Sequence, residues 1–167
     1  TKVLAALEEI LNEGGQTSGI DLATYENFTG LGDYHRSYKD FIASPEQERA
    51  MRDNFWRVVE HLDALSARAN RQFHLGVEPE PFGWFENAAE TLRFFGQMRD
   101  EHPGDARLDR YLGVNYDACH FAIEFEDPAQ ALAQFQTNGI RLSKMHLSNA
   151  LKLRPTATSL RELAAFD

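Results

Sequence analysis

The sequence of 167 residues predicts an α/β fold built from parallel strands. Helical and strand-like segments alternate along the chain, and no hairpin signal joins two neighbouring strands. Alternation of this kind indicates parallel strands that are joined by right-handed crossovers. Three successive strand-like segments also end in a side chain that can bind a metal ion. At this length we expect one domain, over residues 1–167, with its own hydrophobic core.

The first half of the chain is interpreted from leucine spacing and helix-capping residues. Leucines at helical spacing, followed by Gly14-Gly15, predict the first helix. Ser44, Pro45 and Gln47 supply an N-cap, a first-turn proline and a polar residue three positions after the cap, so they predict the start of a long helix. The expected elements are a helix over 2–13, a strand over 19–24, a loop over 25–41 and a helix from 44 to about 70.

The second half repeats this alternation at shorter spacing. Pro103-Gly104 breaks one helix, Asp127-Pro128 supplies the cap and first turn of another, and Asn138-Gly139 ends it. The expected elements are a strand over 73–78, a helix over 84–99, a strand over 111–116, a helix over 127–138, a strand over 140–147 and a weak helix after 155. A closed (β/α)8 barrel needs eight strands and about 250 residues. The four strands expected here are half of that number.

The composition excludes several classes of function. The 26 acidic and 17 basic residues give a net charge of −9, which opposes attraction to phosphate backbones, so we expect no nucleic-acid partner. No apolar run approaches the roughly 20 residues of a membrane span. The single cysteine, Cys119, excludes an internal disulfide framework and is typical of a cytoplasmic protein.

Possible metal ligands stand at the ends of three of the expected strands. Asp117 and His120 form an Asp-x-x-His pair, and Glu78 and His146 each follow an apolar strand. Because the carboxyl ends of neighbouring barrel strands lie on one face, these four side chains can converge. Their oxygen and nitrogen ligands suit Mn²⁺ or Zn²⁺, with Mg²⁺ as a further possibility. Taken singly, Glu78 also fits a solvated loop residue, and His146 a buried core histidine.

Other polar residues have both a functional and a structural interpretation. Glu124 can contact a substrate or belong to a solvated face, and Lys144 can neutralise a bound anion or be a surface cation. Cys119 lies between two possible ligands, but no His-Asn partner pattern surrounds it, so a small buried residue is preferred to a nucleophile. We expect His74 to pack within its strand and Glu80 to belong to an exposed turn.

Three segments resemble the xylose-isomerase-like superfamily of TIM barrels, and more closely its EboE family of metabolite-traffic proteins. They are residues 77–81, 117–128 and 144–151, within a similarity that extends from Lys2 to Phe166. The resemblance implies a (β/α)8 TIM barrel, truncated at both ends, of which only about four parallel strands, the fourth to the seventh, are present. It also implies that Glu78, Asp117 and His120 bind a divalent metal, with His146 as a ligand or neighbour. The EboE family often has Gln at the position of His146.

The same resemblance implies a metal-dependent sugar isomerase or epimerase that acts on a small polyol or sugar-like substrate. In this interpretation Glu78 is catalytic as well as a ligand, and Glu124 and Lys144 contact the substrate. The alternative is an EboE-type metabolite-traffic protein in an export pathway, with membrane-protein partners and without classical catalysis. A remote alternative is an endonuclease IV-like phosphodiesterase, which needs several metals and a basic groove that the net charge of −9 opposes.

Overall fold

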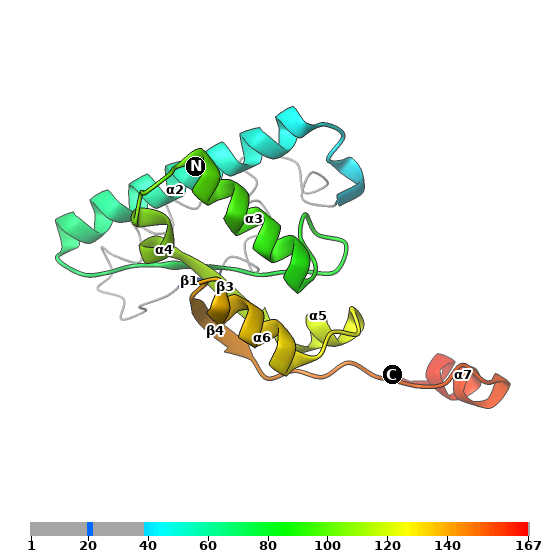
Figure 1. Cartoon of the computed structure of the whole chain (residues 1–167). Coiled ribbons are helices and arrows are strands. Elements are labelled where there is room, and N and C mark those ends of the chain that lie inside the picture. The colour runs from blue at the N-terminus through cyan, green and yellow to red at the C-terminus, as the bar shows by residue number, and fades with distance from the viewer. Residues whose placement is uncertain (1–19, 22–38, 167) are drawn as a thin grey trace.

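The chain forms an α/β structure around a small parallel sheet (Figure 1). The computed structural model describes residues 20–21 and 39–166. The sheet has four strands in the order β1-β2-β3-β4, and each neighbouring pair is parallel. The strands are β1 (Ile20–Asp21), β2 (Leu75–Val77), β3 (Leu112–Asp117) and β4 (Leu142–His146). The α/β class and the parallel sheet are therefore confirmed for the described residues.

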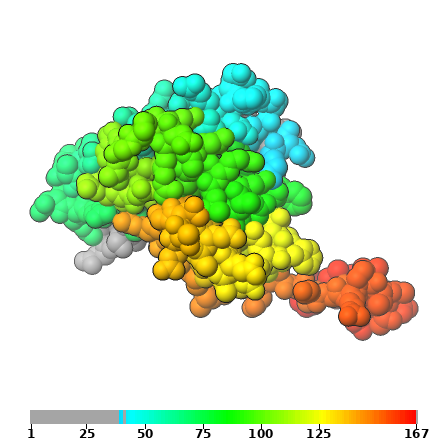
Figure 2. Space-filling model, viewed as in Figure 1, coloured from blue at the N-terminus to red at the C-terminus, as the bar shows by residue number. Residues whose placement is uncertain are grey.

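Helices alternate with these strands along the chain. They are the short 3-10 helix η2 (Lys39–Phe41) and the α-helices α2 (Pro45–Ala69), α3 (Ala88–Glu101), α4 (Arg107–Tyr111), α5 (Ala118–Ile123), α6 (Pro128–Thr137) and α7 (Ala157–Ala164). Among the described residues, no helix combines the length and the apolar character that crossing a bilayer requires. Figure 2 shows that the segment containing α7 projects from the rest of the chain, and none of its residues is buried.

Two helices, α2 and α6, have the boundaries that their capping residues predict. The Ser44 hydroxyl accepts a hydrogen bond from the Gln47 N–H at 3.3 Å, and α2 continues until Asn70, which adopts a left-handed conformation with φ of 49°. The Asp127 carboxylate accepts from the Gln130 N–H at 2.9 Å and begins α6. The expected boundaries of both helices are thus confirmed.

Several other expected boundaries are wrong. The helix expected over 84–99 begins only at Ala88, because the Asn87 side chain is its N-cap. The strand expected over 73–78 is shorter, and Tyr111 ends the short helix α4 instead of beginning a strand. The helix α5 was not expected at all. The helix expected over 2–13 lies outside the described residues, and the strand expected over 19–24 is described only at Ile20–Asp21.

All three longer helices that pack on the sheet cover the same face. On β2 and β3 the residues that join the hydrophobic core alternate along the strand: Leu75 and Val77, then Leu112, Val114 and Tyr116. The same core contains residues of α2, α3 and α6. A sequential order of parallel strands with right-handed crossovers produces this one-sided arrangement.

The opposite face of the sheet is small and polar. It carries Gly76 on β2 and Gly113, Asn115 and Asp117 on β3, because successive side chains of a strand point to opposite faces. Asn115 is fully buried there. This polar face ends, at the carboxyl ends of the strands, in the predicted ligands.

Candidate metal centre

Three predicted ligands come from the carboxyl ends of three adjacent strands. Glu78 directly follows β2, and Asp117 and His146 are the last residues of β3 and β4. The Nδ1 atom of His146 lies 3.1 Å from Oδ2 of Asp117 and 3.9 Å from Oε2 of Glu78. Each of the three offers a ligand atom that lies within 4.8 Å of the other two. Two carboxylates and one imidazole at this spacing form a donor set suited to Mn²⁺ or Zn²⁺.

A β-bulge brings His146 beside Asp117. Val114 pairs with Leu142, but the next residue, Asn115, pairs with Lys144, so Ser143 is an extra residue in β4. Regular pairing from Val114 would place Met145 opposite Asp117, one position short of the histidine. The bulge thus shifts the imidazole into register with the carboxylate.

Two further residues hold the carboxylates in place. The Asn115 side chain donates a hydrogen bond to Oε2 of Glu78, and the Ser148 hydroxyl donates to Oδ1 of Asp117. The Cys119 N–H lies 3.0 Å from the same Asp117 oxygen and 2.8 Å from the Ser148 hydroxyl. Both supporting side chains were missed in the sequence. Their signals were positional, since Asn115 lies two residues before Asp117 on one strand face and Ser148 lies two residues after His146.

These contacts keep Asp117 ionised. Burial by itself raises the pKa of this carboxyl group. Hydrogen bonds from Ser148 and Cys119, together with the nearby His120, outweigh burial and hold the pKa well below its usual value. The carboxylate is therefore available to a cation over the whole physiological pH range.

Glu78 is nearly buried, since its side chain is only 5% exposed. The interpretation of this residue as a solvated loop glutamate is therefore wrong. The side chain of His146 is 31% exposed, so the interpretation of this residue as a buried core histidine is wrong as well. His120 lies next to this group, with Nδ1 at 3.3 Å from Oε1 of Glu78 and 3.0 Å from the Pro79 carbonyl oxygen.

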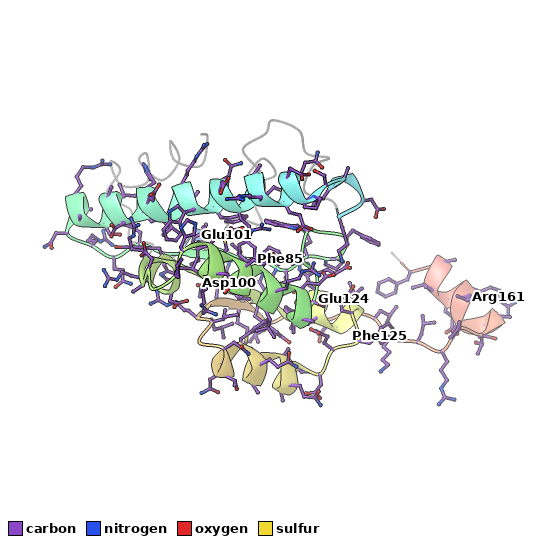
Figure 3. All side chains as sticks on the ribbon, turned by 45° about the horizontal axis from the view of Figure 1, so that its top comes forward. Phe85, Asp100, Glu101, Glu124, Phe125 and Arg161 are labelled. Carbon is purple, nitrogen blue, oxygen red and sulfur yellow. The ribbon has the colours of Figure 1, made fainter. Side chains whose placement is uncertain are left out.

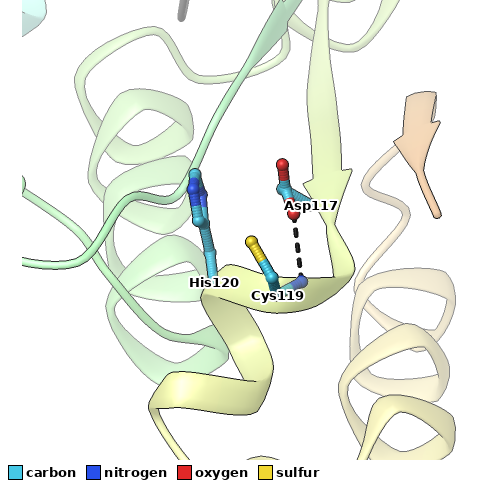
Figure 4. A group of neighbouring side chains, drawn as sticks. All are labelled: Asp117, Cys119 and His120. Carbon is cyan, nitrogen blue, oxygen red and sulfur yellow. Dashed lines mark hydrogen bonds between the residues drawn. The ribbon is translucent and has the colours of Figure 1, made fainter. Parts of the chain in front are cut away.

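Cys119 is half-buried at the start of α5, close to Asp117 and His120 (Figure 4). A hydrogen bond with Ser148 lowers the pKa of its thiol, but burial and the Asp117 carboxylate outweigh this and raise the pKa. The thiol is consequently protonated near neutral pH while no cation is bound. This agrees with the expectation that Cys119 is not a free nucleophile.

The two predicted substrate contacts lie in different surroundings. Lys144 is exposed on β4 and is the register partner of Asn115, so it lies on the strand that ends in His146. Glu124 follows α5 and lies beside the first turn of α3 (Figure 3). Burial and the carboxylates of Glu86 and Glu90 raise its pKa, while Lys39 lowers it. Glu124 thus belongs to a polar cluster around Lys39.

Two remaining expectations concern residues outside this centre. Glu80 is exposed, as the predicted turn requires. His74 precedes β2 and is half-buried, and burial, followed by the nearby Arg141, lowers its pKa. Its Nε2 atom is buried without a hydrogen-bond partner.

The fold and this geometry define a parallel α/β protein with a group of potential metal ligands at the carboxyl edge of its sheet. Comparisons with protein-family models, with curated proteins and with solved structures found no match to the chain.

Proposed function

We propose that the chain belongs to a divalent-metal-dependent (β/α)8 barrel protein of the xylose-isomerase-like type. We further propose that it acts as an isomerase or epimerase on a small polyol or sugar-like substrate. One observation carries the proposal: Glu78, Asp117 and His146 approach one another from three consecutive parallel strands. Active sites of such barrels lie at the carboxyl ends of the strands, where these residues stand.

The strand order supports the barrel part of this proposal. The described strands follow one another without reversal, and the core places the longer helices on one face of the sheet. An open doubly wound sheet instead reverses its strand order and has helices on both faces. In a barrel, the polar face with Gly113 and Asn115 corresponds to the interior.

Glu78 and His120 are suited to the proton transfer that an isomerisation beside a carbonyl group requires. Asn115 holds Oε2 of Glu78, while Oε1 faces the imidazole of His120 at 3.3 Å. The same Nδ1 atom lies 3.0 Å from the Pro79 carbonyl oxygen, which can only accept a hydrogen bond, so this nitrogen carries a hydrogen and can orient the Glu78 carboxylate as the base. A bound divalent ion would polarise adjacent substrate oxygens. Asp117 and His146 would hold that ion beside the glutamate.

A second candidate function is an EboE-type metabolite-traffic protein without classical catalysis. It is favoured by apolar side chains that are exposed in the segments following the ligands: Phe82 at 73%, Phe125 at 81% and Leu147 at 89%. Exposed apolar groups close to a polar site suit a ligand or partner with an apolar part. Saturable binding of an apolar metabolite without turnover of any ketose would favour this candidate over an isomerase.

Metal binding tests the leading proposal. We expect the metal-depleted chain to bind Mn²⁺ or Zn²⁺, measured by calorimetry and by elemental analysis after dialysis. Glu78→Gln and Asp117→Asn should weaken binding by more than the roughly 10–100-fold that is typical of losing an outer-shell partner. Glu80→Gln is the matched control, because Glu80 is exposed and should leave the affinity unchanged. Unchanged metal affinity in both Glu78→Gln and Asp117→Asn would refute the proposal.

Turnover tests the reaction itself. The metal-loaded protein should convert a ketose to its epimer or to the corresponding aldose, and Glu78→Gln should abolish this conversion. Metal binding without any such conversion across a panel of ketoses would retain the metal centre but reject the isomerase.

A further inference from the structure

A second group of ligand atoms shares Asp117 with the centre described above. Asp117, Cys119 and His120 offer one carboxylate oxygen, one sulfur and one imidazole nitrogen, all within 4.8 Å of one another. Figure 4 shows these three side chains projecting to the same side from the end of β3 and the first turn of α5. The three residues come from four consecutive positions, and Ser148 contacts both the Asp117 carboxylate and the Cys119 N–H.

The two groups of potential ligands share one carboxylate. Glu78 and His146 belong to the first group and Cys119 and His120 to the second, while only Asp117 belongs to both. A carboxylate has two oxygens and can bridge two ions, which lie about 3.5–4 Å apart in two-metal sites. His120 also lies 3.3 Å from Glu78, so the two positions are neighbours.

We propose that the centre has a second cation position whose ligands are Asp117, the thiolate of Cys119 and His120, and that this position selects Zn²⁺. The inference rests on the proposed metal-dependent function and adds a second ion to it. Binding breaks the S–H bond of Cys119, forms a metal–sulfur bond and releases one proton to solvent.

The donor atoms give the two positions different metal preferences. A thiolate is a soft ligand that favours Zn²⁺ and disfavours Mg²⁺. The first position has carboxylate and imidazole donors, and it therefore accepts the harder ion Mn²⁺ as well. We expect Mn²⁺ to fill the first position and Zn²⁺ to fill both.

Titration with Co²⁺, a spectroscopic substitute for Zn²⁺, separates the two positions. The wild-type chain should bind two equivalents, one of which produces a near-ultraviolet thiolate-to-cobalt charge-transfer band. Cys119→Ser should lose this band and one equivalent. His146→Gln should lose the other equivalent and keep the band. Circular dichroism verifies that both variants are folded.

Each outcome distinguishes the second position from the proposed function. One equivalent without a charge-transfer band, lost in His146→Gln, refutes the second position and leaves the proposed function intact. A band that survives in Cys119→Ser also refutes it. No bound cobalt in the wild type refutes both proposals.

Thiol reactivity gives a second measurement that needs no variant. Cys119 is the only cysteine, so its modification by a disulfide reagent reports on this position alone. Zn²⁺ should slow the modification by more than about tenfold, and Mg²⁺ should not, because a metal-bound thiolate is a poorer nucleophile. Equal rates with and without Zn²⁺ contradict the proposal.

Discussion

A single methyl group added at Gly113 on β3 tests the pairing of β3 with β4, the strands that end in Asp117 and His146. A Cβ atom at this position would lie 2.3 Å from the Ser143 hydroxyl and 2.7 Å from the carbonyl oxygen of Arg141. The hydroxyl can rotate away, but the carbonyl belongs to the backbone and accepts a hydrogen bond from the Val114 N–H at 2.8 Å. Gly113→Ala must therefore push β4 away from β3.

The expected loss of stability follows from two opposing effects. Overpacking of this kind costs about 1–3 kcal/mol. Replacing glycine by alanine also reduces the entropy of the unfolded chain, which returns roughly 0.4–1 kcal/mol. We expect a net decrease of roughly 1–2 kcal/mol in the free energy of unfolding. Affinity for the metal should fall as well, because the displaced strand carries His146.

Gly96 provides the matched control. It lies within α3, and a Cβ atom added there meets no other atom within 4 Å. Gly96→Ala should raise stability by about 0.5–1 kcal/mol, because alanine favours the helix. Urea unfolding followed by circular dichroism should therefore give changes of opposite sign for the two variants. In thermal unfolding, about 2–4 °C per kcal/mol for a domain of this size should separate the two Tm values by several degrees.

The result that contradicts this reasoning is specific. If Gly113→Ala is as stable as Gly96→Ala and binds metal normally, β3 and β4 do not pair in the register described here. The double change Gly113→Ala with Ser143→Gly should remain destabilised, since the Arg141 carbonyl is still in the way. Full recovery in the double variant would assign the whole effect to the serine hydroxyl.

Two further predictions concern the ends of the described chain. Lys39→Met should lower stability near neutral pH by at most about 1 kcal/mol, because the Lys39 side chain is 38% exposed and its charge is screened by solvent. The hydrogen bond with Lys39 lowers the pKa of Glu86 below its ordinary value of 4.5. The stability that this pair contributes should therefore be lost as the pH falls below 4.5 and through the lowered pKa, and urea unfolding at a series of pH values measures the loss. At the other end, Leu160 and Leu163 of α7 are 50% and 42% exposed, and we expect the 167-residue chain to associate in sedimentation experiments. Replacing both leucines by Glu should reduce association, whereas a wild-type monomer that unfolds cooperatively would contradict the expectation.

The sequence predicts most reliably what short local signals determine. Ser44 and Asn70 mark both ends of α2 because a cap depends on residues next to it in the chain. The convergence of Glu78, Asp117 and His146 was also predictable, since each stands at the carboxyl end of a strand of a parallel sheet. These predictions needed a repeated pattern and no knowledge of distant contacts.

The missed features depend on contacts between distant parts of the chain or on very short elements. Helices α4 and α5 have only five and six residues, too few for helical periodicity to be recognised. Glu124 follows α5 and lies beside the first turn of α3, and its contact with a substrate stays a prediction. The support of Asp117 by Ser148 joins residues 31 positions apart, so it depends on the pairing of β3 with β4.

The bulge in β4 connects these observations. One extra residue, Ser143, is what places His146 opposite Asp117, and without it Met145 would occupy that position. The extra residue has room because β2 and β3 carry glycines next to it: a Cβ atom on Gly76 would lie 3.1 Å from the Ser143 Cβ, and one on Gly113 would meet its hydroxyl. Two glycines that contribute no potential ligand therefore leave room for the bulge that brings His146, and not Met145, to the candidate metal centre. The geometry of the centre depends on the packing of the polar sheet face as much as on the ligands themselves.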